Sequence, residues 1–165
     1  MTRAALGLGA SLGPRAATLH LAARALDAHR HIRVVRGSRI LATPPVGGVA
    51  LASFLNVVLL VETTLSPEAL LAVAKDLEVR LGRRPSRRWC DRVLDIDILL
   101  YGATVVATPT LRVPHARLAE RDFFLQALSE AWPDAPNPWT GLPWSATLRP
   151  RSLCPVVGVL PIVPG

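Results

Sequence analysis

The chain has 165 residues, half of them apolar, and a net charge of +7, which fits one folded domain and excludes an intrinsically disordered protein. No apolar run reaches the about 18 to 20 residues of a membrane helix, and the N-terminus lacks the ordered segments of a signal peptide. We therefore expect a single-domain cytoplasmic protein that does not bind a membrane. The two cysteines, Cys90 and Cys154, lack metal-ligand spacing and are predicted to be free thiols.

Apolar periodicity and turn residues predict four strands and two helices in the first 101 residues. The predicted strands span residues 4–8, 32–41, 54–62 and 94–101. Pro14 suits the first turn of a helix that extends to about residue 29. Ser66 and Pro67 begin a second helix, which Gly82 ends. This order is the ferredoxin-like pattern, so we expect an α/β (α+β) sandwich with helices on one face of an antiparallel sheet.

The last third of the chain gives weaker signals. The pattern predicts a short strand at residues 105–106, an extended segment at 108–115 and a helix at 118–132. From Pro133 onward prolines are frequent and no periodicity holds. Within the single domain 1–165, we therefore separate a core of residues 1–132 from a proline-rich extension of residues 133–165.

Arginine supplies almost all of the positive charge, because Lys75 is the only lysine. Part of this charge is concentrated in residues 83–92, which contain Arg83, Arg84, Arg87, Arg88 and Arg92. The guanidinium group binds phosphate oxygens in pairs and stays charged at all useful pH values. The cluster therefore predicts a polyanionic partner, either the phosphates of a nucleotide or a nucleic acid.

The sharpest chemical signal is the run Leu-Asp-Ile-Asp-Ile at residues 94–98. Side chains alternate along a strand, so Asp95 and Asp97 share one face, about 7 Å apart, while the aliphatic residues fill the other. Two carboxylates in an apolar setting need a cation, and Mg²⁺ prefers carboxylates, water and substrate phosphates. A solvated strand face is the alternative. The nearby arginines favour the metal, because Mg²⁺ and arginine together hold a triphosphate.

Other polar and aromatic residues fit a nucleotide and a flat heterocycle. His115 and Arg121 could each donate to a phosphate, although a lone histidine is more often structural. Asn56 is an amide within an apolar strand, so it needs partners and could match the donors and acceptors of a heterocycle. Phe54 and Phe123 could stack on such a ring, and a place in the core is an equal alternative for each.

Together these residues resemble one family, the 6-hydroxymethyl-7,8-dihydropterin pyrophosphokinases of folate biosynthesis. The likeness spans about residues 4–132, and both the order and the spacing of its motifs fit. The motifs are Leu8-Gly9, Thr43-Pro44-Pro45-Val46-Gly47, Phe54-Leu55-Asn56, Glu78, Gly82-Arg83, Arg88-Trp89, Arg92-Val93-Leu94-Asp95-Ile96-Asp97-Ile98, Val113-Pro114-His115 and Arg121-Asp122-Phe123.

The resemblance implies a ferredoxin-like fold and a transferase that moves the β,γ-diphosphate of ATP to the hydroxymethyl oxygen of the pterin, releasing AMP. It implies two Mg²⁺ ions, and Asp95 and Asp97 match the metal ligands. The matching catalytic residues are Arg83, Arg92, Asp95 and Asp97. The matching nucleotide-binding residues are Glu78, Arg83, Arg88, Trp89, Arg92, His115 and Arg121. The matching pterin-binding residues are Thr43, Pro44, Val46, Phe54, Asn56 and Phe123.

Two alternatives stay open. Cys90 and Asp91 stand where the family usually has Gly-Pro, and the loop after Arg83 is one residue short, which motivates a weakened relative that only binds pterin or nucleotide. A basic nucleic-acid-binding domain explains the arginines but not the acids beside them, which repel phosphates unless a metal is bound. We expect pterin and ATP as partners, no nucleic acid, and a monomer.

Overall fold

The computed structural model describes residues 1–44, 53–82 and 93–161. Its elements in chain order are β1 (Thr2–Ala10), α1 (Arg15–Asp27), β2 (Ile32–Gly37), β3 (Arg39–Thr43), β4 (Phe54–Thr63), α2 (Pro67–Arg80), β5 (Asp95–Tyr101), β6 (Val106–Ala107), β7 (Arg112–Val113), α3 (Asp122–Ala131), α4 (Trp144–Thr147) and β8 (Val156–Val159). Apart from residues 32–41, the order of strands and helices up to residue 101 is the one that the sequence predicts. The mixed α/β class with an antiparallel sheet is confirmed.

The main sheet has the strand order β5-β1-β4-β3-β8, and β2 also pairs with β4. Every pairing in this sheet is antiparallel. The single strand predicted at residues 32–41 is wrong, because it is divided at Ser38 into β2 and β3. The Ser38 hydroxyl accepts a hydrogen bond from the backbone N–H of Val58 at 2.9 Å, while the Ser38 N–H donates to the Val58 carbonyl at 2.8 Å. The Ser38 side chain therefore takes the place of a backbone carbonyl in one of the hydrogen bonds to β4.

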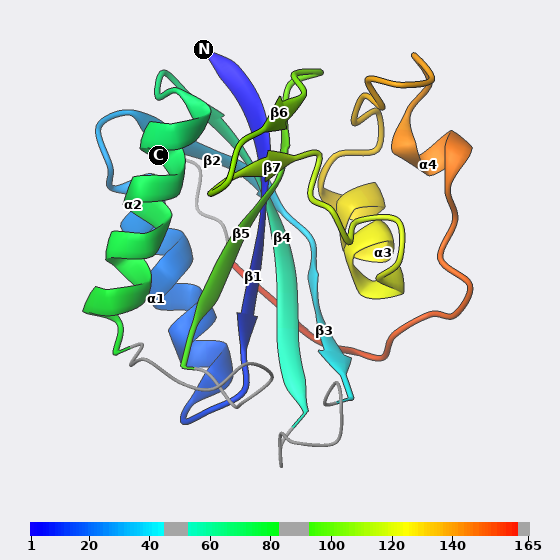
Figure 1. Cartoon of the computed structure of the whole chain (residues 1–165). Helices are drawn as coiled ribbons and strands as arrows, with labels where there is room; N and C mark the ends of the chain where they lie inside the picture. Colours follow the sequence, from blue (N-terminus) through cyan, green and yellow to red (C-terminus); the bar gives the residue numbers. More distant parts are fainter. Residues whose placement is uncertain (45–52, 83–92, 162–165) are drawn as a thin grey trace.

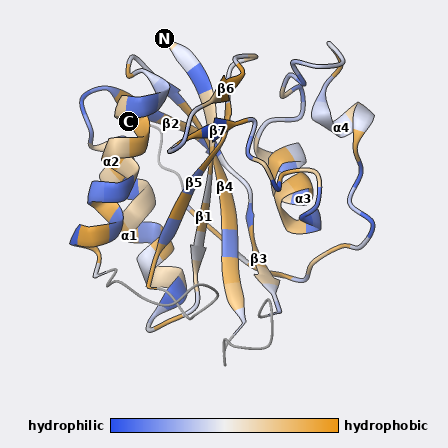
Figure 2. Cartoon of the chain, viewed as in Figure 1, coloured by the Kyte–Doolittle hydropathy of each residue, from blue (hydrophilic) through white to orange (hydrophobic). Residues whose placement is uncertain are grey.

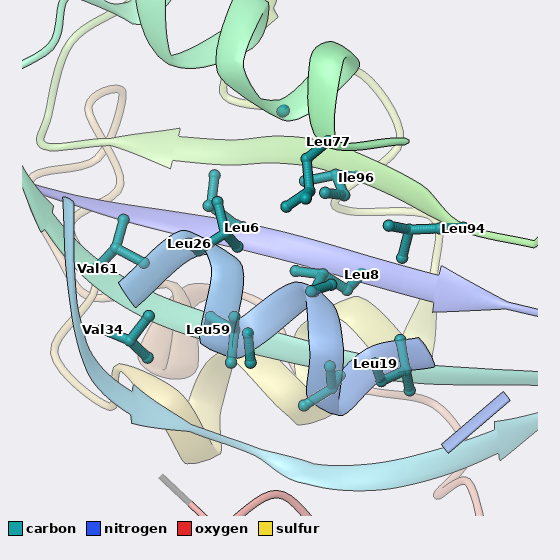
Figure 3. Close-up of a cluster of buried hydrophobic side chains, with 14 of the residues drawn as sticks. Leu6, Leu8, Leu19, Leu26, Val34, Leu59, Val61, Leu77, Leu94 and Ile96 are labelled. Carbon is teal, nitrogen blue, oxygen red and sulfur yellow. The ribbon is translucent and has the colours of Figure 1, made fainter. Parts of the chain in front are cut away.

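Helices cover both faces of the sheet, which corrects the expectation of helices on one face only. Helices α1 and α2 lie side by side on one face, and α3 lies on the other (Figure 1). Between the sheet and α1 and α2 lies a core of buried aliphatic side chains, among them Leu6, Leu8, Leu59 and Ile96 (Figure 3). The face toward α3 buries a second cluster, which includes Val58, Leu60, Leu99, Phe124 and Leu128.

The two predicted helix starts differ in outcome. Helix α2 begins as predicted, because Ser66 caps it by accepting the Ala69 N–H at 3.2 Å and Pro67 follows at the first position. The helix predicted from residue 118 begins at Asp122 instead, and the preceding residues form turns that lead into it. Among the helices of the described ranges, none has both the length and the apolar character needed to cross a membrane.

The C-terminal segment contains regular structure that the sequence did not predict. Strand β8 extends the sheet by pairing with β3, although prolines and exposed valines hide any period. The amide of Gln126 on α3 fixes the approach to β8, since it accepts the Cys154 N–H at 2.7 Å and donates to the Cys154 carbonyl at 3.3 Å. Cys154 itself is a free thiol, as predicted.

Candidate active site

Strand register gathers polar residues on the α3 face, at the end of the sheet where β5 and β4 begin. Gly9 of β1 lies opposite Asp95 of β5 and opposite Asn56 of β4, and Gly7 lies opposite Asp97. These polar positions interrupt otherwise apolar strands (Figure 2). The glycines have no side chain, so they leave space between the carboxylates and the amide. A Cβ on Gly9 would come within 2.8 Å of the Asn56 Oδ1.

Asp95 and Asp97 share a face as the alternation predicts, because Leu94, Ile96 and Ile98 are buried in the core on the opposite face. Burial, and after it the negative charge of Asp95, raises the pKa of Asp97 to about 6. The positive charges of Lys75 and Arg121 oppose this shift. Ionisation of Asp97 is therefore unfavourable beside Asp95, and a bound cation would offset the cost of holding the two negative charges together.

The donor set suits Mg²⁺ held together with a substrate. Within residues 1–44, 53–82 and 93–161, no three or more His, Cys, Asp or Glu side chains form a cluster that could hold a metal. Mg²⁺ does not need such a cage, because it is usually bound by one or two carboxylates, water and substrate phosphates. The carboxylates of Asp95 and Asp97 therefore fit this ion when a phosphate chain supplies the remaining ligands.

His115 stands beside the carboxylates, with its Nε2 3.9 Å from the Oδ1 of Asp97. Its backbone N–H donates to the Leu99 carbonyl at 2.9 Å, and its Nδ1 accepts the Arg117 N–H at 3.1 Å. An acceptor at Nδ1 places the proton of the neutral ring on Nε2. Burial lowers the pKa of His115, and the positive charge of Arg121 lowers it further. The histidine therefore presents an N–H donor toward the carboxylates at neutral pH.

Arg121 caps the start of α3, and its half-buried guanidinium lies over the ring of Phe124, 5.4 Å from the centroid. His115 meets the same ring edge-on, with centroids 5.6 Å apart. Phe124 rests on β1, where a Cβ on Gly7 would approach its Cε1 to 3.0 Å. One buried aromatic thus supports both predicted phosphate donors. The sequence analysis missed Phe124, although it follows Phe123 directly and begins the apolar stripe of α3.

Thr43, Phe54 and Asn56, which are predicted to bind the pterin, lie at the same end of the sheet as the aspartates, on its β3 side. The Nδ2 of Asn56 donates to the Oγ1 of Thr43 at 2.7 Å, and both side chains are buried. The Phe54 ring reaches Gly9, whose Cβ would lie 3.9 Å from the Phe54 Cδ1. Phe123 packs on Phe124 of α3, with ring centroids 4.5 Å apart. Pro44 follows Thr43 at the end of the described segment.

Glu78, predicted to bind nucleotide, is buried on α2 at the edge of β5. Its Oε1 accepts the Ile96 N–H at 2.6 Å and the Lys75 Nζ at 2.9 Å. Its predicted contact with nucleotide stays a prediction. The remaining predicted residues lie outside the described ranges: Val46, Arg83, Arg88, Trp89 and Arg92.

The fold and this site define a ferredoxin-like α/β protein in which paired acids adjoin a histidine and an arginine. Residues 5–133 match the profile of the 7,8-dihydro-6-hydroxymethylpterin-pyrophosphokinase (HPPK) family. The chain therefore belongs to this family, as its motifs implied.

Individual relatives agree with the family assignment. The 2-amino-4-hydroxy-6-hydroxymethyldihydropteridine pyrophosphokinase of Methylorubrum extorquens is 44% identical over 134 residues, 81% of this chain and 85% of the relative. The protein of the same name from Bacillus subtilis is 39% identical over 125 residues, 76% of this chain and 75% of the relative.

Among solved structures, the wild-type HPPK-DHPS of Plasmodium falciparum with pteroate has a TM-score of 0.70 at 14% identity. The match covers 88% of this chain and 41% of that one, so the chain spans about two fifths of the length of that protein. At this identity the likeness shows the fold alone.

Proposed function

We propose that Asp95 and Asp97 hold two Mg²⁺ ions on the phosphates of ATP, and that the family's reaction takes place beside them. As a member of the HPPK family, the chain transfers the diphosphate of ATP to hydroxymethyldihydropterin in folate biosynthesis. The hydroxymethyl oxygen forms a bond to the β-phosphorus, the bond from that phosphorus to the oxygen bridging the α-phosphorus breaks, and AMP leaves. The proposal is carried by the placement of Asp95 and Asp97 on one face of β5, opposite Gly9 and Gly7, with the His115 Nε2 3.9 Å from the Oδ1 of Asp97.

When bound, Mg²⁺ supplies positive charge that offsets the charge developing on the transferred phosphates and lowers the pKa of the attacking hydroxyl. His115 donates its Nε2 proton in a hydrogen bond to a phosphate oxygen, which its position beside Asp97 supports. Arg121 presents its guanidinium from the start of α3 to the same phosphates. Both donors are held in place by Phe124, so they need little reorganisation when ATP binds.

The arginine segment completes this nucleotide site in our proposal. Arg83 and Arg92 contact the reacting phosphates, while Arg88 and Trp89 help to enclose ATP. Glu78 also belongs to the nucleotide side of the site, where it contacts the strand that carries both aspartates. The support for the arginines is their sequence spacing around the aspartates and the need for cations beside a triphosphate.

The pterin binds, in this proposal, at the end of the sheet between β3 and β4. Asn56 and Thr43 form a buried polar pair that can exchange hydrogen bonds with the edge of a pterin. Phe54 and Phe123 stack on the faces of the ring, and Pro44 and Val46 line its border. Burial of the Asn56 amide favours this assignment, because a buried amide needs partners for all of its donors and acceptors.

Calorimetric titration tests the metal assignment. Wild-type protein is titrated with a non-hydrolysable ATP analogue with and without Mg²⁺, and then with the pterin. We expect nucleotide binding to require Mg²⁺ and pterin binding to strengthen once nucleotide is present. We expect Asp97→Asn to bind the ATP analogue only weakly, whether or not Mg²⁺ is present. If this variant binds the analogue and Mg²⁺ as tightly as the wild type, Asp97 is not a metal ligand. If the wild type binds both ligands but forms no AMP from ATP and the pterin, the chain is a weakened relative that only binds them.

We also propose that the chain acts as a single-domain monomer in the cytoplasm. Pairing of β8 with β3 and the Gln126 contact support one domain, since they join the C-terminal segment to the sheet. The ATP requirement of the family supports a cytoplasmic location. Light scattering should give a molar mass near 17.7 kDa. A mass twice as large would show that the protein is a dimer and would contradict the proposed monomer.

A further inference from the structure

Strand β5 carries both aspartates and lies at the end of the main sheet. On the outer edge of β5, where no strand of the described ranges pairs with it, the backbone of Ile96 forms hydrogen bonds with side chains of α2. The Ile96 N–H donates to the Glu78 Oε1 at 2.6 Å, and its carbonyl accepts from the Lys75 Nζ at 3.2 Å. The same ammonium donates to the Glu78 Oε1 at 2.9 Å. Two side chains on one helix thus satisfy both backbone groups of a single edge residue.

Ile96 is the residue between Asp95 and Asp97. Its N–H belongs to the peptide unit that joins it to Asp95, and its carbonyl belongs to the unit that joins it to Asp97. Because peptide units are planar, holding both groups fixes the orientation of the two peptide planes that contain the Cα atoms of Asp95 and Asp97. The Ile96 side chain meanwhile packs in the core near Leu77 of α2 (Figure 3). The backbone under the carboxylates is therefore held from α2 by polar and apolar contacts.

This arrangement differs from an ordinary exposed ion pair on a helix. Glu78 retains only 2% of its side-chain exposure, whereas Lys75 retains 46%. A polar group so deeply buried needs hydrogen-bonding or charged partners to offset its loss of contact with water. Lysine suits the position because its ammonium is a compact charge with three donors, which reach the carboxylate and the carbonyl together. It is the only lysine in a chain otherwise rich in arginine.

We propose that Lys75 and Glu78 are positioning residues of the metal site, which hold Asp95 and Asp97 in the geometry that binds Mg²⁺ with ATP. This inference rests on the proposed role of the two aspartates. It adds Lys75, which no family motif indicated, and it gives Glu78 a second role through Ile96.

Lys75→Met tests the proposal, because it keeps the aliphatic stem and removes the ammonium. Partners that orient metal ligands typically change metal affinity or activity by about 10- to 100-fold. We expect the Mg²⁺ concentration for half-maximal turnover to rise by about 10-fold, with the pterin KM unchanged. Lys75→Arg should recover part of the loss.

Arg33→Met is the matched control, since it removes a charge paired with Glu62 at the opposite end of the sheet. A Mg²⁺ dependence equal to that of this control would overturn the proposal.

Two further measurements separate positioning from simple stabilisation. Thermal unfolding of Lys75→Met reports any loss of stability, which by itself leaves the Mg²⁺ dependence of the folded enzyme unchanged. Hydrogen exchange at the Ile96 amide reports its hydrogen bond to the Glu78 Oε1. We expect faster exchange in Lys75→Met, because the variant removes the ammonium that holds the same carboxylate oxygen. Unchanged exchange would contradict the proposed link through Ile96.

Asp97→Asn distinguishes failure of this inference from failure of the metal site. If that variant binds Mg²⁺ and the ATP analogue like the wild type, the metal site itself is wrong. If it loses binding while Lys75→Met keeps the wild-type Mg²⁺ dependence, the metal site stands and the positioning role fails.

Discussion

The two faces of the sheet use alternate residues of the same strands and differ in how helices cover them. On one face α1 and α2 lie side by side over an apolar layer that includes Leu6 and Leu59. On the other face the ten-residue helix α3 covers Val58 and Leu99, and the positions beyond it are glycine, amide and carboxylate. The face with less helical cover is the one where a substrate can reach the strands.

Neighbouring residues of one strand face opposite sides of the sheet, so one can contribute to stability while the next contributes to catalysis. Ile96 belongs to the core between β5 and α2, while Asp95 and Asp97 on either side of it form the proposed metal site. Substitutions on the first face should therefore change the free energy of unfolding, and substitutions on the second should change catalysis. Each prediction below tests whether the faces separate in this way.

Asp97→Asn carries the largest expected effect on the chemical face. The amide keeps the shape of the side chain but loses the charge that binds a cation. Removing one electrostatic contact to a reacting group costs about 10² to 10³-fold in turnover, and we expect at least about 10³-fold for a metal ligand. AMP formation with dihydropterin measures the loss, with circular dichroism to verify the fold. Turnover near the wild-type rate would mean that the carboxylate takes no part in the reaction.

Leu59→Ala tests the opposite face, where the side chain is fully buried against Leu6 and α1. Deleting a buried leucine side chain leaves a cavity and costs about 2 to 5 kcal/mol of unfolding free energy. Chemical denaturation measures this loss. We expect turnover per folded molecule to stay near the wild-type value at a temperature where the variant remains native. A large drop in turnover without a loss of stability would show that the faces are not independent.

Gly9→Ala should act on the pterin side of the chemical face. Its Cβ would approach the Asn56 Oδ1 to 2.8 Å, so the amide must move away from its present position. Disturbing about one buried hydrogen bond, worth about 1 to 1.5 kcal/mol, should raise the pterin KM by about 10-fold. Gly158→Ala in β8 is the matched control, because its Cβ would make only an ordinary contact with Ile40 at 3.5 Å. Equal KM values for the two variants would contradict the placement of the pterin.

The alternation that separates the faces is also what the sequence could predict. Apolar and acidic residues alternate from Leu94 to Ile98, so the shared face of Asp95 and Asp97 follows from local strand geometry. The start of α2 is equally local, since Ser66 and Pro67 determine it. Assigning the pterin and nucleotide residues required resemblance to a family, because their roles depend on a ligand and not on periodicity.

The features that the sequence missed depend on contacts between distant segments. Ser38 ends β2 because its hydroxyl meets Val58, twenty residues later. Strand β8 exists because β3 offers it an edge and Gln126 holds Cys154 in place. The placement of α3 on the opposite face is likewise a matter of packing, which the order of elements does not determine. Phe124 acquires its role only when this helix meets Gly7.

The smallest expected effect is a pH dependence that only the chemical face should show. Burial and the charge of Asp95 raise the pKa of Asp97 from its ordinary value of 3.8 to about 6. For a raised pKa, the stabilising contribution is complete below pH 3.8 and is lost as the pH rises through about 6. Without Mg²⁺, the ionised aspartate therefore destabilises the folded protein at neutral pH, and Asp97→Asn removes this cost.

Denaturation in EDTA at several pH values measures the difference between wild type and Asp97→Asn. We expect the variant to gain about 1 kcal/mol relative to the wild type between pH 4 and pH 8, a value reduced by the solvent near a side chain that is partly exposed. Titrating groups that do not interact with Asp97 cancel in the difference, whereas the repulsion between Asp97 and Asp95 is part of the measured cost. Leu59→Ala is the control on the opposite face, and its cost should be the same at every pH because it changes no charge. A flat profile for Asp97→Asn would mean that the two carboxylates do not compete, and that the chemical face needs no cation.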